Sequence, residues 1–240
     1  MRPIPYIILF LLSAVLARAQ QVVDVNKLEY NQVSSNGNIT MSANGVLSSP
    51  VKFIRVTSGT PYFSEYWTKG TLVLEGGKAY ANLSLRLDLM NNEVEYKDVN
   101  GQEMTATSPI QYIFLTDSIT GAKFDFVRGA QIGVGDKLLS KTFFQVLVNE
   151  KVSLLRQISK RAQESITYGS ATQEESIVTI NAYYVRMNGN LSRFKWDDWQ
   201  EIFKDKKDSL SAFIRTNHLK GKSEEDYIKL VTYYNTFNTL

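Results

Sequence analysis

The chain has no cysteine and only one histidine among its 240 residues. Without cysteine it can form neither a disulfide nor a thiolate metal site, and a zinc site of cysteine and histidine is excluded. The single histidine, His218, lies in the segment Asn217–Gly221, which has the pattern of a helix end, where the helix dipole favours an imidazole. No serine-histidine or cysteine-histidine catalytic arrangement can be drawn around it. We therefore predict no catalytic histidine, no metal site and no cofactor.

Long apolar runs are also scarce, and the one at the N-terminus predicts a secretory signal. Arg2 gives the positive start, Ile7–Leu12 the apolar centre and Ala17–Ala19 a small-x-small cleavage motif. The apolar segment is shorter than the roughly 20 residues that span a bilayer. We predict that residues 1–19 are a signal peptide and that the mature protein is exported, periplasmic or secreted, without a transmembrane span.

The chain has no large excess of charge of either sign, with 27 basic and 24 acidic side chains. The net charge is +3, and removal of Arg2 and Arg18 with the signal peptide would leave 25 basic and 24 acidic side chains. Nucleic-acid binding depends on clustered Lys and Arg that neutralise phosphates. We therefore predict that nucleic acid is not a partner.

The sequence does contain many short β-patterned segments separated by turns. In Asn82–Leu89 leucine and polar residues alternate strictly, which in a strand gives one apolar and one polar face. Paired Asn and Gly residues, which accept the positive φ angles of tight hairpin turns, follow several segments. These pairs are Asn36-Gly37, Asn44-Gly45, Gly76-Gly77, Asn91-Asn92, Asn100-Gly101 and Asn188-Gly189. They predict strands that pair antiparallel through direct hairpins.

Other segments lead to more specific expectations. Val51–Val56 and Lys123–Val127 alternate as strands do, and Phe143–Val148 and Val152–Ile158 should form a hairpin. The nearly continuous apolar run Ile110–Leu115 predicts a strand buried on both faces. Residues 159–176 are mostly polar, and we predict an exposed loop there.

The pattern changes to a helical period at Trp196. Trp199, Ile202 and Phe203 share one helical face, and Asp205 could cap a second helix that Gly221 ends in a left-handed conformation. A third helix should begin after a capping pattern of Ser223 and Asp226. Its buried face is expected to carry Tyr227, Leu230, Val231 and Tyr234.

Together these patterns predict an α+β protein. We expect an antiparallel β-meander sheet, either open or rolled into a half barrel, with two or three C-terminal helices. The predicted organisation is a β-rich domain over residues 20–195 and a helical segment over residues 196–240 that packs on the sheet.

A cluster of aromatic residues at the start of the meander is the candidate binding surface. Tyr62, Phe63, Tyr66 and Trp67 could present a platform to a sugar ring or a hydrophobic partner. The alternative interpretation is that these rings plug the end of the sheet. Buried aromatic residues dominate core energetics more often than they mark a site, which favours the plug.

Carboxylates are the remaining candidates for catalysis. Glu93 and Glu95 should share the polar face of one strand, at a spacing that a glycosidase could use. The pattern S-x-x-K at Ser49–Lys52 requires a helix, whereas Pro50 favours an extended chain there. Gly133–Asp136 and Asp98–Gly101 are too short for a dinucleotide-binding or calcium-binding loop and predict turns. We assign no catalytic residue.

Several short motifs give the chain a resemblance to uncharacterised secreted proteins of Bacteroidetes-type bacteria. They are Gly59–Phe63 followed by Trp67 and Gly70, the strand with Tyr183-Tyr184, and the tail with Tyr233–Asn235. The resemblance covers most of the mature chain and implies export and a layout of sheet followed by helices. It implies no activity and no catalytic residues.

For function, the sequence favours a non-enzymatic envelope or secreted protein that binds an unknown ligand or protein partner. One alternative is a periplasmic carrier of a lipid or another apolar ligand. The other is a carboxylate-dependent glycan hydrolase. An enzyme would bring two carboxylates together in a cleft, whereas a carrier would enclose an apolar cavity of about 300 Å³ or more.

Overall fold

The computed structural model describes residues 22–24, 31–35, 38–43, 46–50, 58–166 and 173–237, with side chains over 58–163 and 176–237. The predicted signal peptide and the predicted strand Val51–Val56 lie outside the described residues. The strands are β1 (Val22–Asp24), β2 (Asn31–Ser35), β3 (Asn38–Ala43), β4 (Val46–Pro50), β5 (Thr68–Leu74), β6 (Ala79–Asp88), β7 (Glu93–Lys97), β8 (Glu103–Ala106), β9 (Ile110–Thr116), β10 (Lys123–Arg128), β11 (Phe143–Val148), β12 (Ser153–Ile166), β13 (Gln173–Met187) and β14 (Asn190–Phe194). The helices are α1 (Trp199–Ile202), α2 (Lys207–Thr216) and α3 (Glu224–Thr236).

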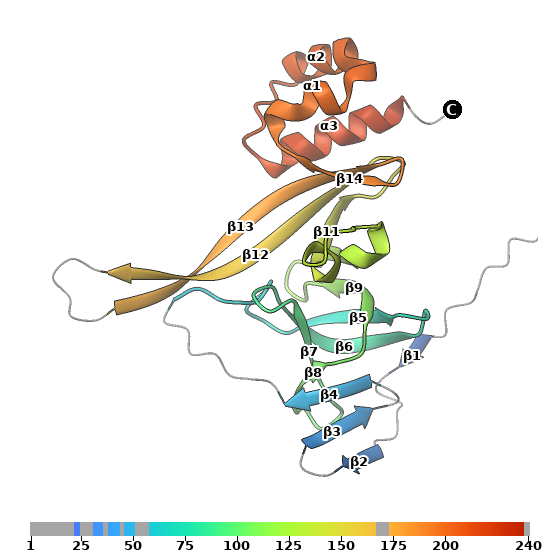
Figure 1. Cartoon of the computed structure of the whole chain (residues 1–240), viewed down its shortest axis with the longest axis vertical. Coiled ribbons are helices and arrows are strands. Elements are labelled where there is room, and N and C mark those ends of the chain that lie inside the picture. Colours follow the sequence, from blue (N-terminus) through green and yellow to red (C-terminus); the bar gives the residue numbers. More distant parts are fainter. Residues whose placement is uncertain are drawn as a thin grey trace, which may run out of the picture.

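The strands form one twisted sheet that stays open, with the helices at its C-terminal end (Figure 1). The strand order is β14-β13-β12-β11-β10-β9-β5-β6-β7-β8-β4-β3-β2, and β1 pairs in parallel with β6. The pairs along the main path are antiparallel, and within the described segments β14 and β2 form the two ends. The α+β class and the C-terminal helices are therefore confirmed.

Tight turns create the meander as the sequence predicts. Strands flank each of the predicted Asn and Gly pairs, and Gly76, Gly77, Asn92, Gly101 and Asn188 have positive φ angles. A left-handed conformation costs Gly and Asn less than other residues, so these positions reverse the chain locally.

The alternating leucines supply the main core. Leu83, Leu85 and Leu87 are buried on one face of β6, and Leu89 is buried directly after it. They join apolar side chains from β5, β7, β9 and β10. The expectation for β9 is wrong: Ile113 and Leu115 are buried, but Phe114 is 40% exposed on the opposite face. β9 therefore buries only the face that carries Ile113 and Leu115, and its other face is only partly covered.

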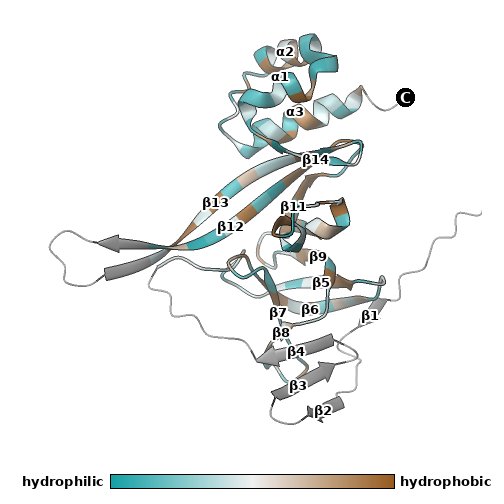
Figure 2. Ribbon diagram, in the orientation of Figure 1, coloured by the Kyte–Doolittle hydropathy of each residue, from teal (hydrophilic) through white to brown (hydrophobic). Residues whose placement is uncertain are grey.

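The predicted loop over residues 159–176 is also wrong. β12 and β13 pair continuously from Ser153–Arg186 to Ile166–Gln173, so strands occupy most of this segment. The resulting hairpin extends away from the body of the molecule (Figure 1). Hydrophilic and hydrophobic residues alternate along its coloured part (Figure 2).

The helical tail has its own core against β11–β14. Val148, Leu154, Val185 and Phe194 of the sheet pack with buried residues of the helices, among them Phe203, Leu210, Tyr227, Leu230, Val231 and Tyr234. Asn235 of α3 closes the arrangement, because its amide accepts from the Val152 backbone N–H at 2.9 Å and donates to the Val152 carbonyl at 2.8 Å. The predicted buried face of the third helix is confirmed.

Two predicted helix boundaries need correction. α2 begins at Lys207 without a side-chain cap, and the Asp205 carboxylate instead accepts a hydrogen bond from the Tyr234 hydroxyl at 3.1 Å. Gly221 is left-handed as predicted, with φ 67°, but it lies beyond the end of α2, where His218 is the first left-handed residue. Gly221 instead lies against Trp196, where any Cβ would overlap the indole. The cap of α3 is as predicted, since Ser223 accepts from the Asp226 N–H.

Within the described residues, no helix is long and apolar enough to cross a membrane.

Candidate functional site

Residues 61–67, which carry the four predicted aromatic side chains and are called the aromatic segment below, are hydrogen-bonded to the sheet beside the end of β6. The Phe63 N–H donates to the Leu87 carbonyl at 2.8 Å, and the Leu89 N–H donates to the Pro61 carbonyl at 3.0 Å. Tyr62 is thereby opposite Asp88 in an antiparallel bridge. Because opposed residues of such a pair share a face and neighbours alternate, Tyr62 and Phe63 point to opposite faces of the sheet.

The four aromatic side chains have different surroundings. Phe63 packs edge-on against Phe124 and Phe126, each with a ring centroid 5.0 Å away, and joins the main core. Tyr62 and Trp67 are partly buried over the polar face of β6 and β7, while Tyr66 is 66% exposed. The structure therefore does not bring the four rings together on one surface.

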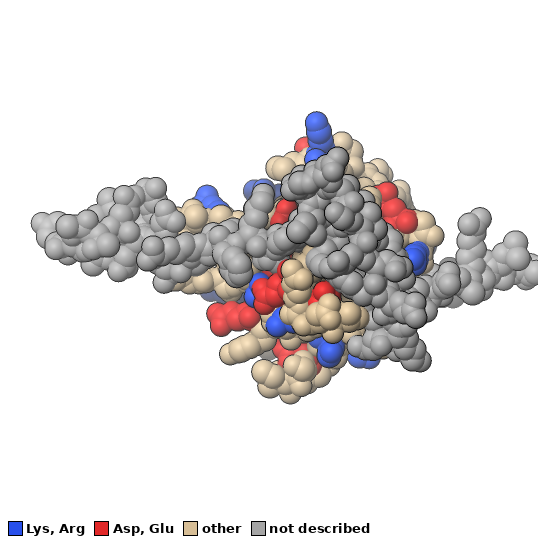
Figure 3. All heavy atoms as spheres, turned by 90° about the horizontal axis from the view of Figure 1, so that it is seen from below, with Lys and Arg blue, Asp and Glu red and all other residues tan. Residues whose placement is uncertain are grey.

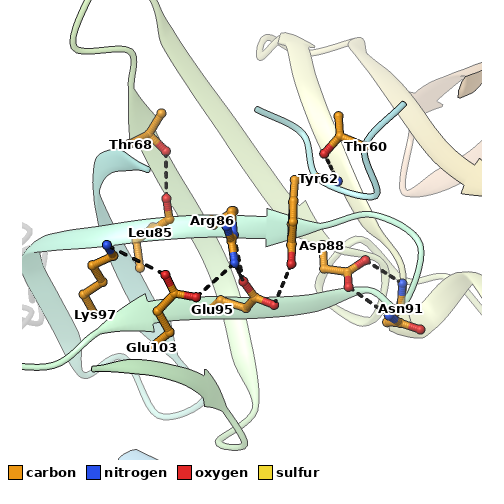
Figure 4. Close-up of polar contacts among 10 residues, drawn as sticks. All are labelled: Thr60, Tyr62, Thr68, Leu85, Arg86, Asp88, Asn91, Glu95, Lys97 and Glu103. Atoms are coloured by element: carbon orange, nitrogen blue, oxygen red, sulfur yellow. Dashed lines mark hydrogen bonds and ion pairs between the residues drawn. The ribbon is translucent and has the colours of Figure 1, made fainter. Parts of the chain in front are cut away.

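Tyr62 and Trp67 enclose the guanidinium group of Arg86. Its central carbon lies 3.9 Å from the Tyr62 ring centroid and 4.4 Å from the Trp67 centroid. Arg86 also forms an ion pair of 2.7 Å with Glu95 and a longer one of 3.4 Å with Glu103 (Figure 4). These contacts join β6, β7, β8 and the aromatic segment into one polar network.

Glu95 lies at the centre of this network and is only 4% exposed. Burial raises the pKa of its carboxyl group, although Arg86 and the Tyr62 hydroxyl, 3.3 Å from Glu95 Oε1, oppose that change. Burial and the neighbouring Glu95 also raise the pKa of Tyr62 from 10.0 to about 12. Glu93 is exposed, so the prediction that both glutamates share a solvated face is wrong for Glu95. The aromatic segment covers that part of the strand.

A separate cavity of about 610 Å³ opens where several strands of the sheet begin or end. Its lining comes from the β5–β6 turn, the start of β7, the β8–β9 connection, the end of β10 and the segment before β11. The lining residues are Glu75, Asn92, Glu93, Val94, Thr105, Ala106, Thr107, Ser108, Pro109, Ile110, Arg128, Ala130, Ser140, Lys141 and Phe143. Most of these side chains are polar, and they include two glutamates and two cations.

Arg128 is the most unusual residue of this lining. It is partly buried, and its guanidinium group lies over the Phe143 ring, 4.9 Å from the centroid. Among the described residues, the side chain makes no hydrogen bond and no ion pair. Burial lowers the pKa of the guanidinium, and only the more distant charge of Glu75 opposes this. The cation is therefore largely uncompensated within the described part of the chain.

A smaller hollow of about 260 Å³ lies on the other face of β9, β10 and β11. Tyr112 and Phe114 stack along its wall with ring centroids 6.3 Å apart, and Arg186 reaches it from β13. The Arg186 Nε is buried and finds no acceptor in the described chain. This hollow is too small for a ligand of the usual size, since ligand pockets range from about 300 to 1,000 Å³.

Sequence reasoning missed Arg128, although the sequence holds a signal for it. In Lys123–Arg128 the alternation places Phe124, Phe126 and Arg128 on one face, and Phe124 and Phe126 belong to the main core. A charged residue in step with core phenylalanines must find a partner or a polar space. The cavity is that space.

An open hollow of about 500 Å³ lies over α2 and α3 and is lined by Phe213, Ile228 and Tyr233, among others. The charges and possible metal ligands of the described residues give no further candidate. On the face seen from below, acidic and basic side chains are intermingled (Figure 3). Within the described residues, no group of at least three His, Cys, Asp or Glu side chains is arranged to hold a metal ion. His218 is exposed.

No protein-family model matches the chain, and no curated protein or solved structure matches it either.

Proposed function

We propose that the protein is an exported, non-enzymatic binding protein that holds a small polar ligand in the cavity beside Arg128. The observation that carries the proposal is the size and lining of this cavity. Its volume of about 610 Å³ lies within the range of small-molecule sites, and charged and hydroxyl side chains converge on it.

The polar lining argues against a carrier of lipid or another apolar ligand at this site. Glu75, Glu93, Arg128 and Lys141 would lose water to an apolar ligand without gaining a hydrogen bond. Burying a charged group without a partner is costly. A ligand with several hydrogen-bonding groups fits the lining better.

The export part of the proposal has separate support. It rests on the signal-peptide pattern of residues 1–19 and on the resemblance to secreted proteins. N-terminal sequencing of the protein from its own cell should give Gln20 as the first residue of the mature chain. Retention of Met1 in the envelope fraction would contradict this part.

Native mass spectrometry of the protein purified from the producing cell tests the binding function. Ala130 lines the cavity and is exposed, so Ala130→Trp should fill the cavity without disturbing the core. Ala212→Trp is the matched control, because Ala212 is exposed on α2, away from the cavity. We expect a small molecule on the wild type and on Ala212→Trp but not on Ala130→Trp. Equal retention by all three proteins, or by none, would contradict the proposal.

A glycan hydrolase is the second candidate, because Glu75 and Glu93 line the same cavity. Glycoside hydrolysis uses two carboxyl groups about 5 to 9.5 Å apart on either side of the bond that breaks. The test is release of reducing ends from cell-wall and storage polysaccharides by the wild type, by Glu75→Gln and by Glu93→Gln. If the wild type releases reducing ends and each substitution alone abolishes this release, the protein is a hydrolase and not a non-enzymatic binding protein.

A further inference from the structure

We infer that the cavity recognises an acidic group, a carboxylate or a phosphate, through the guanidinium of Arg128. This inference rests on the proposed function, because it names the chemistry of the ligand that the same cavity would hold.

The charge of Arg128 is unsatisfied within the described chain. An arginine side chain stays protonated in proteins and carries five N–H donors. In the described chain, the donors of Arg128 make no hydrogen bond and no ion pair. A partly buried cation of this kind is stabilised only when an acceptor enters the space beside it. That space is the cavity, which Arg128 lines.

The Arg128 guanidinium is also oriented by a neighbouring ring. Phe143, only 1% exposed, lies beneath the guanidinium at 4.9 Å and supports it by a cation–π contact. Support of one face leaves the N–H groups at the edge of the plane available. That edge matches the paired oxygens of a carboxylate or a phosphate, which arginine binds with two parallel hydrogen bonds.

The other charged residues of the lining limit how much negative charge the ligand can carry. Lys141 is exposed on the same lining and adds a second cation, whereas Glu75 and Glu93 add two negative charges. A polyphosphate or another strongly anionic chain would be repelled by these glutamates. The lining instead suits a small molecule with one acidic group and several hydroxyl or amino groups.

The test is a titration of the full mature protein with sodium phosphate and, separately, with sodium acetate at constant ionic strength. The readout is the ¹⁵N-edited NMR signal of each arginine Nε–H. Arg86 and Arg156 are already paired with Glu95 and Glu224. Arg193 and Arg215 are exposed and report on non-specific binding of anions. We expect a saturable shift of the Arg128 signal, several-fold larger than that of any other arginine.

Substitutions make the test specific. In Arg128→Gln the response of the Gly129 and Lys141 amide signals to the anion should fall at least tenfold. Arg128→Lys should retain part of the response, because lysine keeps the charge but loses the planar pair of donors. The spectra themselves show whether each variant is folded. An Arg128 response no larger than that of Arg193, in both titrations, would overturn the inference.

The outcomes separate this inference from the proposed function. If Arg128 ignores both anions while Ala130→Trp still abolishes retention of the native ligand, the cavity binds a neutral molecule and only the inference fails. If Arg128 responds but Ala130→Trp changes nothing in retention, the anion site exists and the proposed function fails. A response to phosphate alone or to acetate alone supports the inference and identifies the source of the acidic group.

Discussion

Two of the partly buried arginines, Arg86 and Arg128, lie in contrasting surroundings. Two aromatic rings, Tyr62 and Trp67, lie against the Arg86 guanidinium, and Glu95 and Glu103 pair with it. One ring covers one face of the Arg128 guanidinium, and no carboxylate of the described chain is paired with it. Burial and a neighbouring aromatic ring therefore do not by themselves mark a binding site. The distinguishing feature is whether the donors of the cation are already used within the fold.

The four aromatic residues predicted to form a binding surface lie in three different surroundings. Tyr62 and Trp67 complete the surroundings of Arg86 and hold the chain before β5 against the sheet. Phe63 belongs to the main core, and Tyr66 is left exposed. The aromatic segment therefore mainly stabilises the fold by covering Arg86 and Glu95. No comparable segment of the described chain covers the cavity beside Arg128.

We expect the largest loss of unfolding free energy from the substitution Arg86→Gln. Arg86→Gln removes a cation that contacts the Tyr62 and Trp67 rings, and it leaves the buried Glu95 without its ion pair. Breaking a buried pair in this way costs about 3 kcal/mol of unfolding free energy. Urea denaturation measures the loss, and Arg193→Gln, at an exposed position of β14, is the control. A loss equal to that of the control would show that the Arg86 network has no structural importance.

Glu95→Gln tests the same network through its dependence on pH. Because burial raises the pKa of Glu95 in the folded state, the wild type gains stability from the protonated form and loses it as pH rises above the ordinary value of 4.5. Glutamine does not titrate. The unfolding free energy of the variant should therefore improve relative to the wild type between about pH 4 and about pH 7. Urea denaturation across this range measures the difference, and the opposite slope would contradict the raised pKa.

A smaller difference is expected between two tyrosines of the aromatic segment. Tyr62→Phe removes the hydroxyl that donates to Glu95 at 3.3 Å, which should cost about 1 kcal/mol. Tyr66→Phe changes an exposed ring and should stay within about 0.5 kcal/mol of the wild type. Thermal and urea unfolding compare the two variants. Equal effects would mean that the Tyr62 hydroxyl has no role in the network.

Local patterns in the sequence predicted much of this fold. The leucine alternation of β6, the Asn and Gly turn pairs and the face of α3 all depend on neighbours in the chain, and all are confirmed. The outer part of β12 and β13 escaped prediction because its polar residues show no apolar face. Pairing between the two strands holds them as strands there, and such pairing leaves no local signature.

The candidate site depended on contacts that a single segment cannot reveal. The alternation of residues in β7 predicts that Glu95 lies on the polar face of the strand. Glu95 is nevertheless buried, because Tyr62, which is distant in sequence, packs over it. Alternation also places Arg128 in step with Phe124 and Phe126. Only the packing of several strand ends shows that the Arg128 guanidinium faces a cavity and is not paired with an acidic side chain.

The most direct test of this contrast is the unfolding free energy of Arg128→Gln in buffer without small anions. Since Arg128 has no acceptor in the described chain, removing its charge should leave stability within about 1 kcal/mol of the wild type or raise it. Phosphate should then stabilise the wild type in proportion to its occupancy, and it should not stabilise the variant. A loss in Arg128→Gln as large as that in Arg86→Gln would show that Arg128 is a structural residue and would contradict the account.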